Sequence, residues 1–222
     1  MSRQTFPSAF FPSVLPGFLI AIGGLWGAVA SEVIAVEPSQ PIIAVEEDWE
    51  LIIGSPDADS AAPQIRCVMS PSRDLESTHV AFTINHHTQP AYQSGGLQLQ
   101  VWDGQTLEKS RSAPSNKLLS HPGEIIRWTQ RMSIAGGVVT FEILNGSSTT
   151  WKEFGGEGHL KLTIPTVRTD FKEYHPLVST ANSEVGFAAN RVEGLLQKEV
   201  RVYTSEGLLW QGKGVDEEEQ QP

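Results

Sequence analysis

The segment GGVVTFEILNGSSTTWKEFGG, Gly136–Gly156, decides the fold class, because its apolar residues recur at every second position. Val139, Phe141 and Ile143 share one side of this alternation. Alternate residues of a strand point to opposite faces of a sheet, so the period of two predicts a strand with one face in a core. The dipeptide Asn145-Gly146 follows and is typical of a tight hairpin turn, which predicts that the chain reverses there.

The same period of two recurs along the rest of the chain. Further runs are Val80–Ile84, Leu97–Val101, Leu160–Ile164 and Val200–Val202, and Gly-rich turn signals separate them. Such alternation is typical of antiparallel sheets covered on one side. We therefore predict an all-β, two-sheet antiparallel jelly-roll sandwich of about a dozen strands. Val192–Lys198 is a weak helix candidate, and Phe171–Tyr174 is a candidate turn.

The N-terminus has the pattern of a secretory signal peptide. Arg3 is the only charged residue before Glu32, and an apolar run, Phe18–Val29, ends in the A-x-A site that closes at Ala30. An uncleaved membrane anchor is the alternative, but a spanning helix needs about 20 apolar residues. We predict that residues 1–30 are removed, which leaves a secreted or periplasmic protein with no membrane partner.

The mature chain is predicted to hold one domain. Residues 31–41 are expected to be a linker, 42–211 the β-sandwich, and 212–222 an acidic, disordered tail with four consecutive acids. The net charge of −10 over 222 residues argues against a nucleic-acid partner. The single cysteine, Cys67, excludes a disulfide framework and a multi-cysteine zinc site, and its apolar surroundings predict a buried, inert thiol.

Two segments resemble a known family of sandwiches. Gly136–Gly156 looks like a hairpin of the concanavalin A-like lectins and glucanases, with a strand, an N-G-S-S turn and a W-x-x-F-G strand. Asn182–Gly207, NSEVGFAANRVEGLLQKEVRVYTSEG, resembles the closing strands of laminin-G-like jelly rolls, which run into a "VRVY" strand. The resemblance implies a sandwich whose concave sheet and rim loops bind sugars or other proteins in many relatives. Other relatives hydrolyse or cleave polysaccharides.

Three carboxylates close together in the sequence are the candidate catalytic residues. Glu46, Asp48 and Glu50 alternate in VEEDWEL, so on a strand they share one face. The two glutamates are about 13 Å apart along the backbone and could lean to the ~5 Å separation of a retaining glycosidase. The spacing resembles the E-x-D-x-E signature of glucanases, although Glu47 stands where those enzymes have an apolar residue. The alternative is the polar outer face of an edge strand, with Trp49 facing the core.

Metal ligands are sparse, and no cofactor is expected. Asp57 and Asp59 could supply two oxygen ligands to Ca²⁺, the one ion left open. His86 and His87 are adjacent, so on a strand they face opposite ways and cannot chelate one ion.

A tryptophan between amides is the candidate sugar platform. Trp102 alternates with the apolar run and lies beside Gln98 and Gln100, which predicts a solvent-facing ring with hydrogen-bonding neighbours. Trp151 is a second candidate near a turn, whereas Trp128 is expected in the core.

Three functions remain open at this point. The first is a secreted, non-catalytic binding module for a glycan. The second is a structural or protein-interaction domain of an exported assembly, with an extracellular protein as partner. The third is a polysaccharide-degrading glycoside hydrolase that uses Glu46 and Glu50.

Overall fold

The computed structural model describes residues 40–55, 63–85, 96–113, 121–150, 152–156 and 160–214. All of them belong to the unit Glu37–Pro222, and the predicted signal peptide lies outside the described residues. No helix within these ranges is long and apolar enough to cross a membrane.

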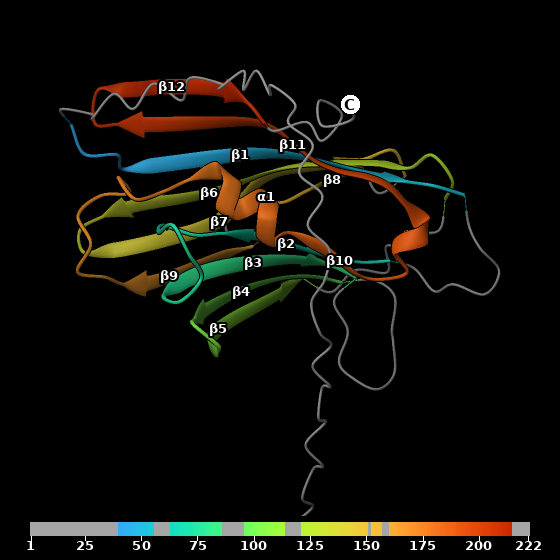
Figure 1. Ribbon diagram of the computed structural model, residues 1–222, viewed down its shortest axis with the longest axis horizontal. Helices are drawn as coiled ribbons and strands as arrows, with labels where there is room; N and C mark the ends of the chain where they lie inside the picture. Colours follow the sequence, from blue (N-terminus) through green and yellow to red (C-terminus); the bar gives the residue numbers. More distant parts are fainter. Residues whose placement is uncertain are drawn as a thin grey trace, which may run out of the picture. The chain divides into compact units, whose positions relative to one another are not determined.

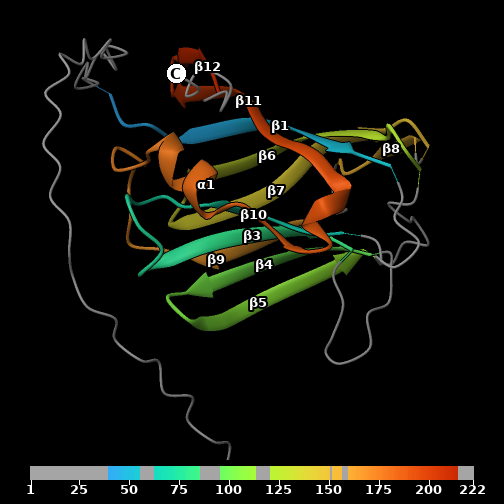
Figure 2. The same ribbon diagram turned by 45° about the vertical axis from the view of Figure 1, so that its right-hand side comes forward.

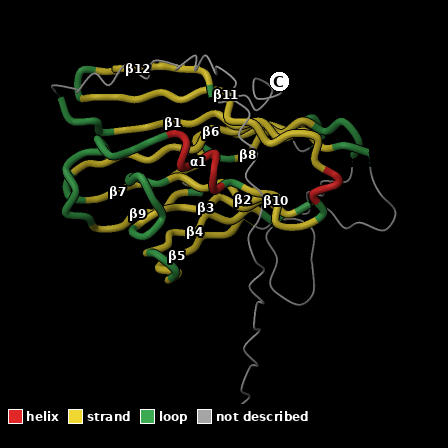
Figure 3. Tube along the Cα trace, viewed as in Figure 1, coloured by secondary structure: helices red, strands yellow, loops and turns green. Residues whose placement is uncertain are grey.

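Strands dominate the described residues (Figure 3). In chain order the elements are β1 (Ala44–Ile53), β2 (Gln64–Met69), β3 (Thr78–Ile84), β4 (Leu97–Asp103), β5 (Thr106–Ala113), β6 (Ile125–Ala135), β7 (Val138–Ser148), β8 (Lys152–Phe154), β9 (Lys161–Pro165), α1 (Pro176–Asn182), β10 (Glu184–Phe187), the 3-10 turn η1 (Ala189–Arg191), β11 (Val192–Thr204) and β12 (Gly207–Lys213).

The strands form two antiparallel sheets packed as a sandwich (Figure 1). Sheet A has the order β12-β11-β1-β6-β7-β8, and β9 also pairs with β7. Sheet B has the order β10-β2-β3-β4-β5. The prediction of an all-β, two-sheet jelly-roll sandwich is confirmed.

The core lies between the sheets and is built from the alternation seen in the sequence. Trp49 of β1 stacks on Trp128 of β6, with ring centroids 6.4 Å apart, and Phe82 of β3 meets Trp128 edge-on at 5.6 Å. Offset and edge-on contacts of this kind are the favoured geometries of aromatic pairs. Trp128 is thus a core residue, as predicted. Cys67 is also fully buried between the sheets and carries a free thiol, and burial raises its pKa well above the usual range.

The expectation that Glu46–Glu50 lies on an edge strand is wrong. β1 pairs with β11 on one side and with β6 on the other, so it lies inside sheet A. The sequence pattern of an edge strand and of a central strand with one solvent face is the same, since both alternate apolar and polar residues. Register with distant strands decides between them.

The predicted turn at Asn145-Gly146 is also wrong. β7 continues through both residues to Ser148, and Gly146 pairs with Phe154 of β8. A Cβ atom at position 146 would lie 2.3 Å from the Phe154 ring. The glycine is therefore required by the ring that covers it rather than by a turn.

The helix lies at a different place in the chain from the predicted one. Val192–Lys198 belongs to β11, while the helix is α1, which the sequence analysis missed. α1 begins at Pro176, and its N-cap His175 accepts a hydrogen bond from the Leu177 backbone N–H at 3.3 Å. Proline at the first helical position is favourable because its missing N–H needs no partner there. The expected turn before it is present, since Tyr174 N–H donates to the Phe171 carbonyl at 2.9 Å.

α1 lies at the side of the sandwich, between β1 of sheet A and β2 of sheet B (Figure 2). Ser183, just after the helix, accepts a hydrogen bond from the Val68 backbone N–H at 3.0 Å through its hydroxyl. Toward the C-terminus, β12 extends to Lys213, which is two residues into the segment 212–222 that the sequence predicted to be a tail.

Candidate functional site

The three predicted carboxylates lie together on the solvent face of sheet A. Their side chains are 12%, 31% and 13% exposed for Glu46, Asp48 and Glu50 respectively. The intervening residues of β1 point into the sandwich. We call the three acids, with the side chains that bind them, the carboxylate face.

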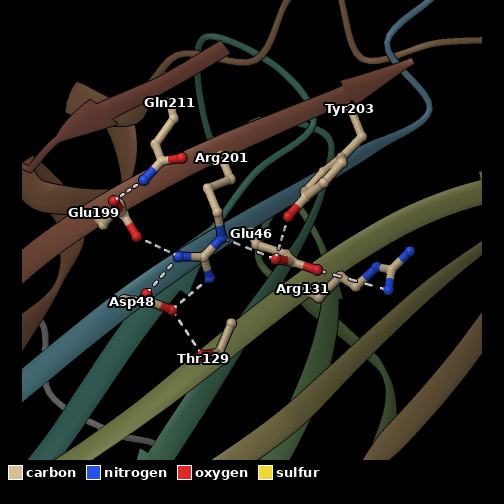
Figure 4. Close-up of polar contacts among 8 residues, drawn as sticks. All are labelled: Glu46, Asp48, Thr129, Arg131, Glu199, Arg201, Tyr203 and Gln211. Atoms are coloured by element: carbon tan, nitrogen blue, oxygen red, sulfur yellow. Dashed lines mark hydrogen bonds and ion pairs between the residues drawn. The ribbon is translucent and has the colours of Figure 1, made fainter. Parts of the chain in front are cut away.

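Arg201 of β11 occupies the centre of this face (Figure 4). Its guanidinium binds both oxygens of Asp48, at 2.6 and 2.8 Å, and donates from Nε to Glu46 at 3.0 Å. It also contacts Glu199, two residues away on its own strand, at 2.5 Å. Hydrogen bonds with Asp48, and then with Glu46 and Glu199, raise the pKa of Arg201. A single cation thus serves three carboxylates.

Neighbouring strands complete the coordination of the central acids (Figure 4). The Tyr203 hydroxyl donates to Glu46 at 2.8 Å, and the Thr129 hydroxyl donates to Asp48 at 2.7 Å. Arg131 adds an ion pair to Glu46 at 3.6 Å. Burial and the bond to Glu46 raise the pKa of Tyr203, which keeps its hydroxyl a donor. Gln211 of β12 donates to Glu199 at the far side of the cluster.

Glu50 has its own cation. Arg127 contacts it with Nε at 2.7 Å and with Nη2 at 2.6 Å, and Lys198 lies 4.0 Å away. Glycoside hydrolysis by two carboxylates needs one that carries a proton to the leaving group and one that faces the sugar. Close guanidinium groups on both glutamates, Arg201 on Glu46 and Arg127 on Glu50, instead suit a fixed ion-pair network.

The predicted sugar platform lies on the solvent face of sheet B. Gln98, Gln100 and Trp102 alternate along β4 with buried apolar residues and are half-buried. Gln100 Nε2 donates to Gln98 Oε1 at 2.5 Å, and Gln98 Nε2 donates to the hydroxyl of Ser112 on β5 at 2.8 Å. We call these four side chains the amide face. The structure therefore brings three of the four predicted binding residues together, while Trp151 lies outside the residues described.

Trp102 has a buried neighbour, and its own indole N–H is also buried. It pairs across the sheet with His79 of β3, whose ring contacts the Ser77 carbonyl at 3.0 Å through Nδ1. Burial lowers the pKa of His79, so this ring is neutral at physiological pH. The indole nitrogen of Trp102 is itself buried, and within the described part of the chain its N–H has no hydrogen-bond partner.

A buried carboxylate that the sequence analysis did not single out lies behind the carboxylate face. Glu47 points into the sandwich and is 0% exposed. Four donors surround it, and they are Trp49 Nε1 at 3.0 Å, Gln130 Nε2 at 2.7 Å, the Tyr174 hydroxyl at 2.8 Å and the Ser179 hydroxyl at 2.5 Å. Burial raises the pKa of Glu47, and burial also raises that of Tyr174.

The Glu47 network joins parts of the chain that are distant in sequence. Tyr174 and Ser179 come from α1 and the segment before it, whereas Gln130 comes from β6. The sequence did contain a signal, because Glu47 shares its side of the β1 alternation with Trp49 and Leu51, both of which face the core. The network fastens α1 to sheet A and takes no part in the solvent faces.

Other sequence candidates cannot be placed. Asp57, Asp59, His86 and His87 lie outside the described residues. Where the chain is described, no three His, Cys, Asp or Glu side chains gather in a way that could hold a metal ion. Comparison with known proteins gives no match to any protein-family model and no match among curated proteins. The site must therefore be interpreted from its own geometry.

Proposed function

We propose that the protein is a secreted, non-catalytic binding module of the concanavalin A-like class, and that it binds a glycan on the amide face. The observation that carries this proposal is the half-buried side chain of Trp102 on the outer face of sheet B, in line along β4 with the hydrogen-bonded amides of Gln98 and Gln100. Aromatic rings stack on the apolar faces of sugars, and amide and hydroxyl groups match sugar hydroxyls as donors and acceptors.

The amide face is uncharged at its centre, which suits a neutral glycan. Gln98 pairs across the sheet with Ser112 and Gln100 with Ser110, so amides and hydroxyls alternate over two strands. The hydrogen bonds that link Gln100, Gln98 and Ser112 hold these side chains in position before a ligand arrives. A preorganised surface of this kind loses less side-chain entropy on binding.

The carboxylate face supports the binding module over the hydrolase. Glu46 and Glu50 are each bound by a guanidinium at 3.0 Å or less, which leaves no carboxylate of the pair free of a cation. The signal peptide and the secreted location belong to the same proposal and rest on the pattern of residues 1–30.

A polysaccharide panel with matched variants tests the proposal. Trp102→Ala is expected to weaken binding about tenfold or more, which corresponds to about 1.4 kcal/mol, and Gln98→Ala is expected to weaken it severalfold. Phe187→Ala removes an exposed aromatic ring from β10, at the opposite edge of the same sheet, and is expected to leave affinity unchanged.

Two results would contradict this function. Glycan binding that is equally strong in the Trp102→Ala variant would remove the site. Hydrolysis of a polysaccharide that disappears with Glu50→Gln would replace the binding module with a glycoside hydrolase.

A further inference from the structure

α1 lies against the side of the sandwich without burying an apolar side chain of its own (Figure 2). Among its seven residues only Ser179 is buried, and Leu177 is 49% exposed. Helices in proteins gain most of their stability by packing an apolar face, and a helix this short is marginal alone. Polar contacts therefore keep α1 in place.

Glu47 provides the main polar contact, and its two carboxyl oxygens have different partners. Oε1 accepts from the hydroxyls of Tyr174 at 2.8 Å and Ser179 at 2.5 Å, which belong to α1 and the segment before it. Oε2 accepts from Trp49 at 3.0 Å and Gln130 at 2.7 Å, which belong to sheet A. One oxygen thus binds the helix side and the other binds the sheet, so the carboxyl group joins the two.

The segment that contains α1 is anchored at both of its ends. Phe171 is fully buried in the core, and its backbone N–H donates to the Ile42 carbonyl at 2.9 Å. After α1, the chain enters β10 at Glu184, which pairs with β2. We call residues 172–183, between these anchors, the α1 cover. Main-chain hydrogen bonds donated by Tyr174 and Ser183 go to carbonyls of residues 171–179, so they do not tie the cover to a sheet.

Cys67 of β2 lies beside the groups that hold the α1 cover. Burial raises the pKa of its thiol, a hydrogen bond with Ser183 lowers it in part, and the charge of Glu47 raises it further. The hydroxyl of Ser183 also accepts from the Val68 backbone N–H at 3.0 Å. Movement of the cover away from the sheets therefore removes a residue that shields the thiol.

We propose that the α1 cover opens as a unit in the folded protein, and that ionisation of Glu47 loosens it. In the closed state the carboxyl group carries a proton, which Oε1 donates to the hydroxyl oxygen of Tyr174 or Ser179. Hydroxyl groups accept as well as donate, so no hydrogen bond is lost. Trp49 Nε1 and Gln130 Nε2 only donate, and Oε2 stays their acceptor. In the open state water reaches the carboxylate and solvates its charge.

Among the described residues, no cation offsets a negative charge on Glu47 from the elements packed against it. β6 contributes Gln130, and β11 contributes Val200, which pairs with Glu47 across the sheet. The α1 cover contributes two hydroxyl groups, of which the Tyr174 hydroxyl is kept neutral by a raised pKa that burial causes. β2 contributes the neutral thiol of Cys67, while Arg66 points to the other face of that strand.

The direction of the pH dependence follows from this burial. Burial raises the pKa of Glu47 in the closed protein, whereas the solvated carboxyl group of the open form titrates near its usual value of 4.5. The closed form therefore holds the proton more tightly than the open form. The cover is most firmly closed below the pKa of the open form and loosens as the pH rises through that of the closed form.

Slow labelling of Cys67 with dithiodipyridine in the full chain measures the opening. Ser179→Ala removes one hydrogen bond to Glu47 and is expected to raise the labelling rate about tenfold or more. Thr180→Ala is the matched control, because this neighbouring hydroxyl donates within the helix, to the Leu177 carbonyl at 3.2 Å. The control is expected to leave the rate within about twofold of the wild type.

Urea separates opening of the α1 cover from unfolding of the whole domain. A short segment exposes little surface, so the labelling rate should rise only weakly with urea below the unfolding transition. Labelling with the full urea dependence of global unfolding overturns the proposal. Equal labelling rates in Ser179→Ala and Thr180→Ala overturn it as well.

The ratio of the wild-type labelling rate to that of Glu47→Gln tests the role of ionisation. At each pH this ratio cancels the ionisation of the thiol itself, which both proteins share. It should rise from pH 5 to pH 8, because only the wild type has a carboxyl group at position 47 to ionise. A ratio that is constant or falls over this range overturns the proposed effect of Glu47.

Discussion

Replacement of Glu47 by alanine is expected to destabilise the fold by about 3 kcal/mol, because it removes the acceptor of four buried donors. The hydroxyls of Tyr174 and Ser179 can rotate toward other acceptors. The indole N–H of Trp49 is fixed by its ring and loses its partner outright, while Gln130 Nε2 keeps only the Val68 carbonyl at 3.5 Å. An unsatisfied buried donor costs about 1–3 kcal/mol, and relief of the buried negative charge offsets part of the sum.

Glu47→Gln is the matched variant and should cost about 1 kcal/mol or less. The glutamine oxygen can accept from Trp49 and Gln130, which only donate, while its NH₂ group faces Tyr174 and Ser179, whose oxygens can accept. The difference in unfolding free energy between Glu47→Ala and Glu47→Gln therefore measures the cost of leaving these buried nitrogens without the acceptor. Glu142→Ala serves as the external control, because its carboxylate lies on the solvent face with one ion pair to Lys161 at 3.3 Å. That variant should change stability by less than about 1 kcal/mol.

The pH dependence gives the same network a second test. Burial raises the pKa of Glu47 in the folded protein above its usual value of 4.5. The folded state then holds the proton more tightly than the unfolded chain, so the associated stability is fully present below the unfolded pKa. It is lost as the pH rises through the folded pKa. The stability of the wild type relative to Glu47→Gln should therefore increase from pH 8 to pH 5.

Urea unfolding followed by tryptophan fluorescence measures all these differences, since Trp49 and Trp128 are buried. The reasoning fails if Glu47→Ala and Glu47→Gln are equally stable. It also fails if the stability gap between the wild type and Glu47→Gln is constant across this pH range.

Three further outcomes are expected. Arg201→Met should destabilise the fold by about 2 kcal/mol in urea unfolding, because three carboxylates lose their shared cation. Arg127→Met removes an exposed ion pair and should cost less than about 1 kcal/mol. Equal losses of stability in the two variants would refute a central role for Arg201. Gly146→Ala should destabilise the fold by about 1–3 kcal/mol through a clash with the Phe154 ring, and thermal unfolding should show this as a lower melting temperature. Gly186→Ala, whose Cβ would lie 3.8 Å or more from its neighbours, should leave the melting temperature nearly unchanged. Cys67 should resist a thiol reagent in the native protein and react after denaturation, because burial shields the thiol and raises its pKa. Rapid labelling of the native protein would contradict this and would show that the core around Cys67 opens to solvent.

The alternation of single residues predicted the faces of strands but not their neighbours. Trp128 in the core, Trp102 on the outside and the shared face of Glu46, Asp48 and Glu50 all follow from a period of two. The position of β1 inside sheet A depends on pairing with β11, some 150 residues later, and no local pattern encodes that register.

The same distinction applies to the candidate site: the local pattern predicted which residues share a face, but not which residues of other strands lie beside them. The shared face of Gln98, Gln100 and Trp102 was predictable because these three residues lie on one strand, β4, whereas Ser112 comes from β5. The arginines of the carboxylate face come from β6 and β11, so their partners could not be assigned without the register. α1 was missed because its seven residues are too few to show a helical period. Gly146 misled the turn prediction because close approach of a ring requires glycine just as a turn does.

The place of β1 between β6 and β11 sets the order in which sheet A can be completed. Among the described strands β1 is synthesised first, but Asp48 is 153 residues ahead of the Arg201 that neutralises it. Until that arginine has left the ribosome, β1 has one neighbour at most, and its acids lack their central cation. Contacts this distant in sequence slow folding, because a long loop must close before they form. Sheet A therefore cannot be completed while the chain is only partly synthesised, and β1 is among the last strands to gain both of its neighbours.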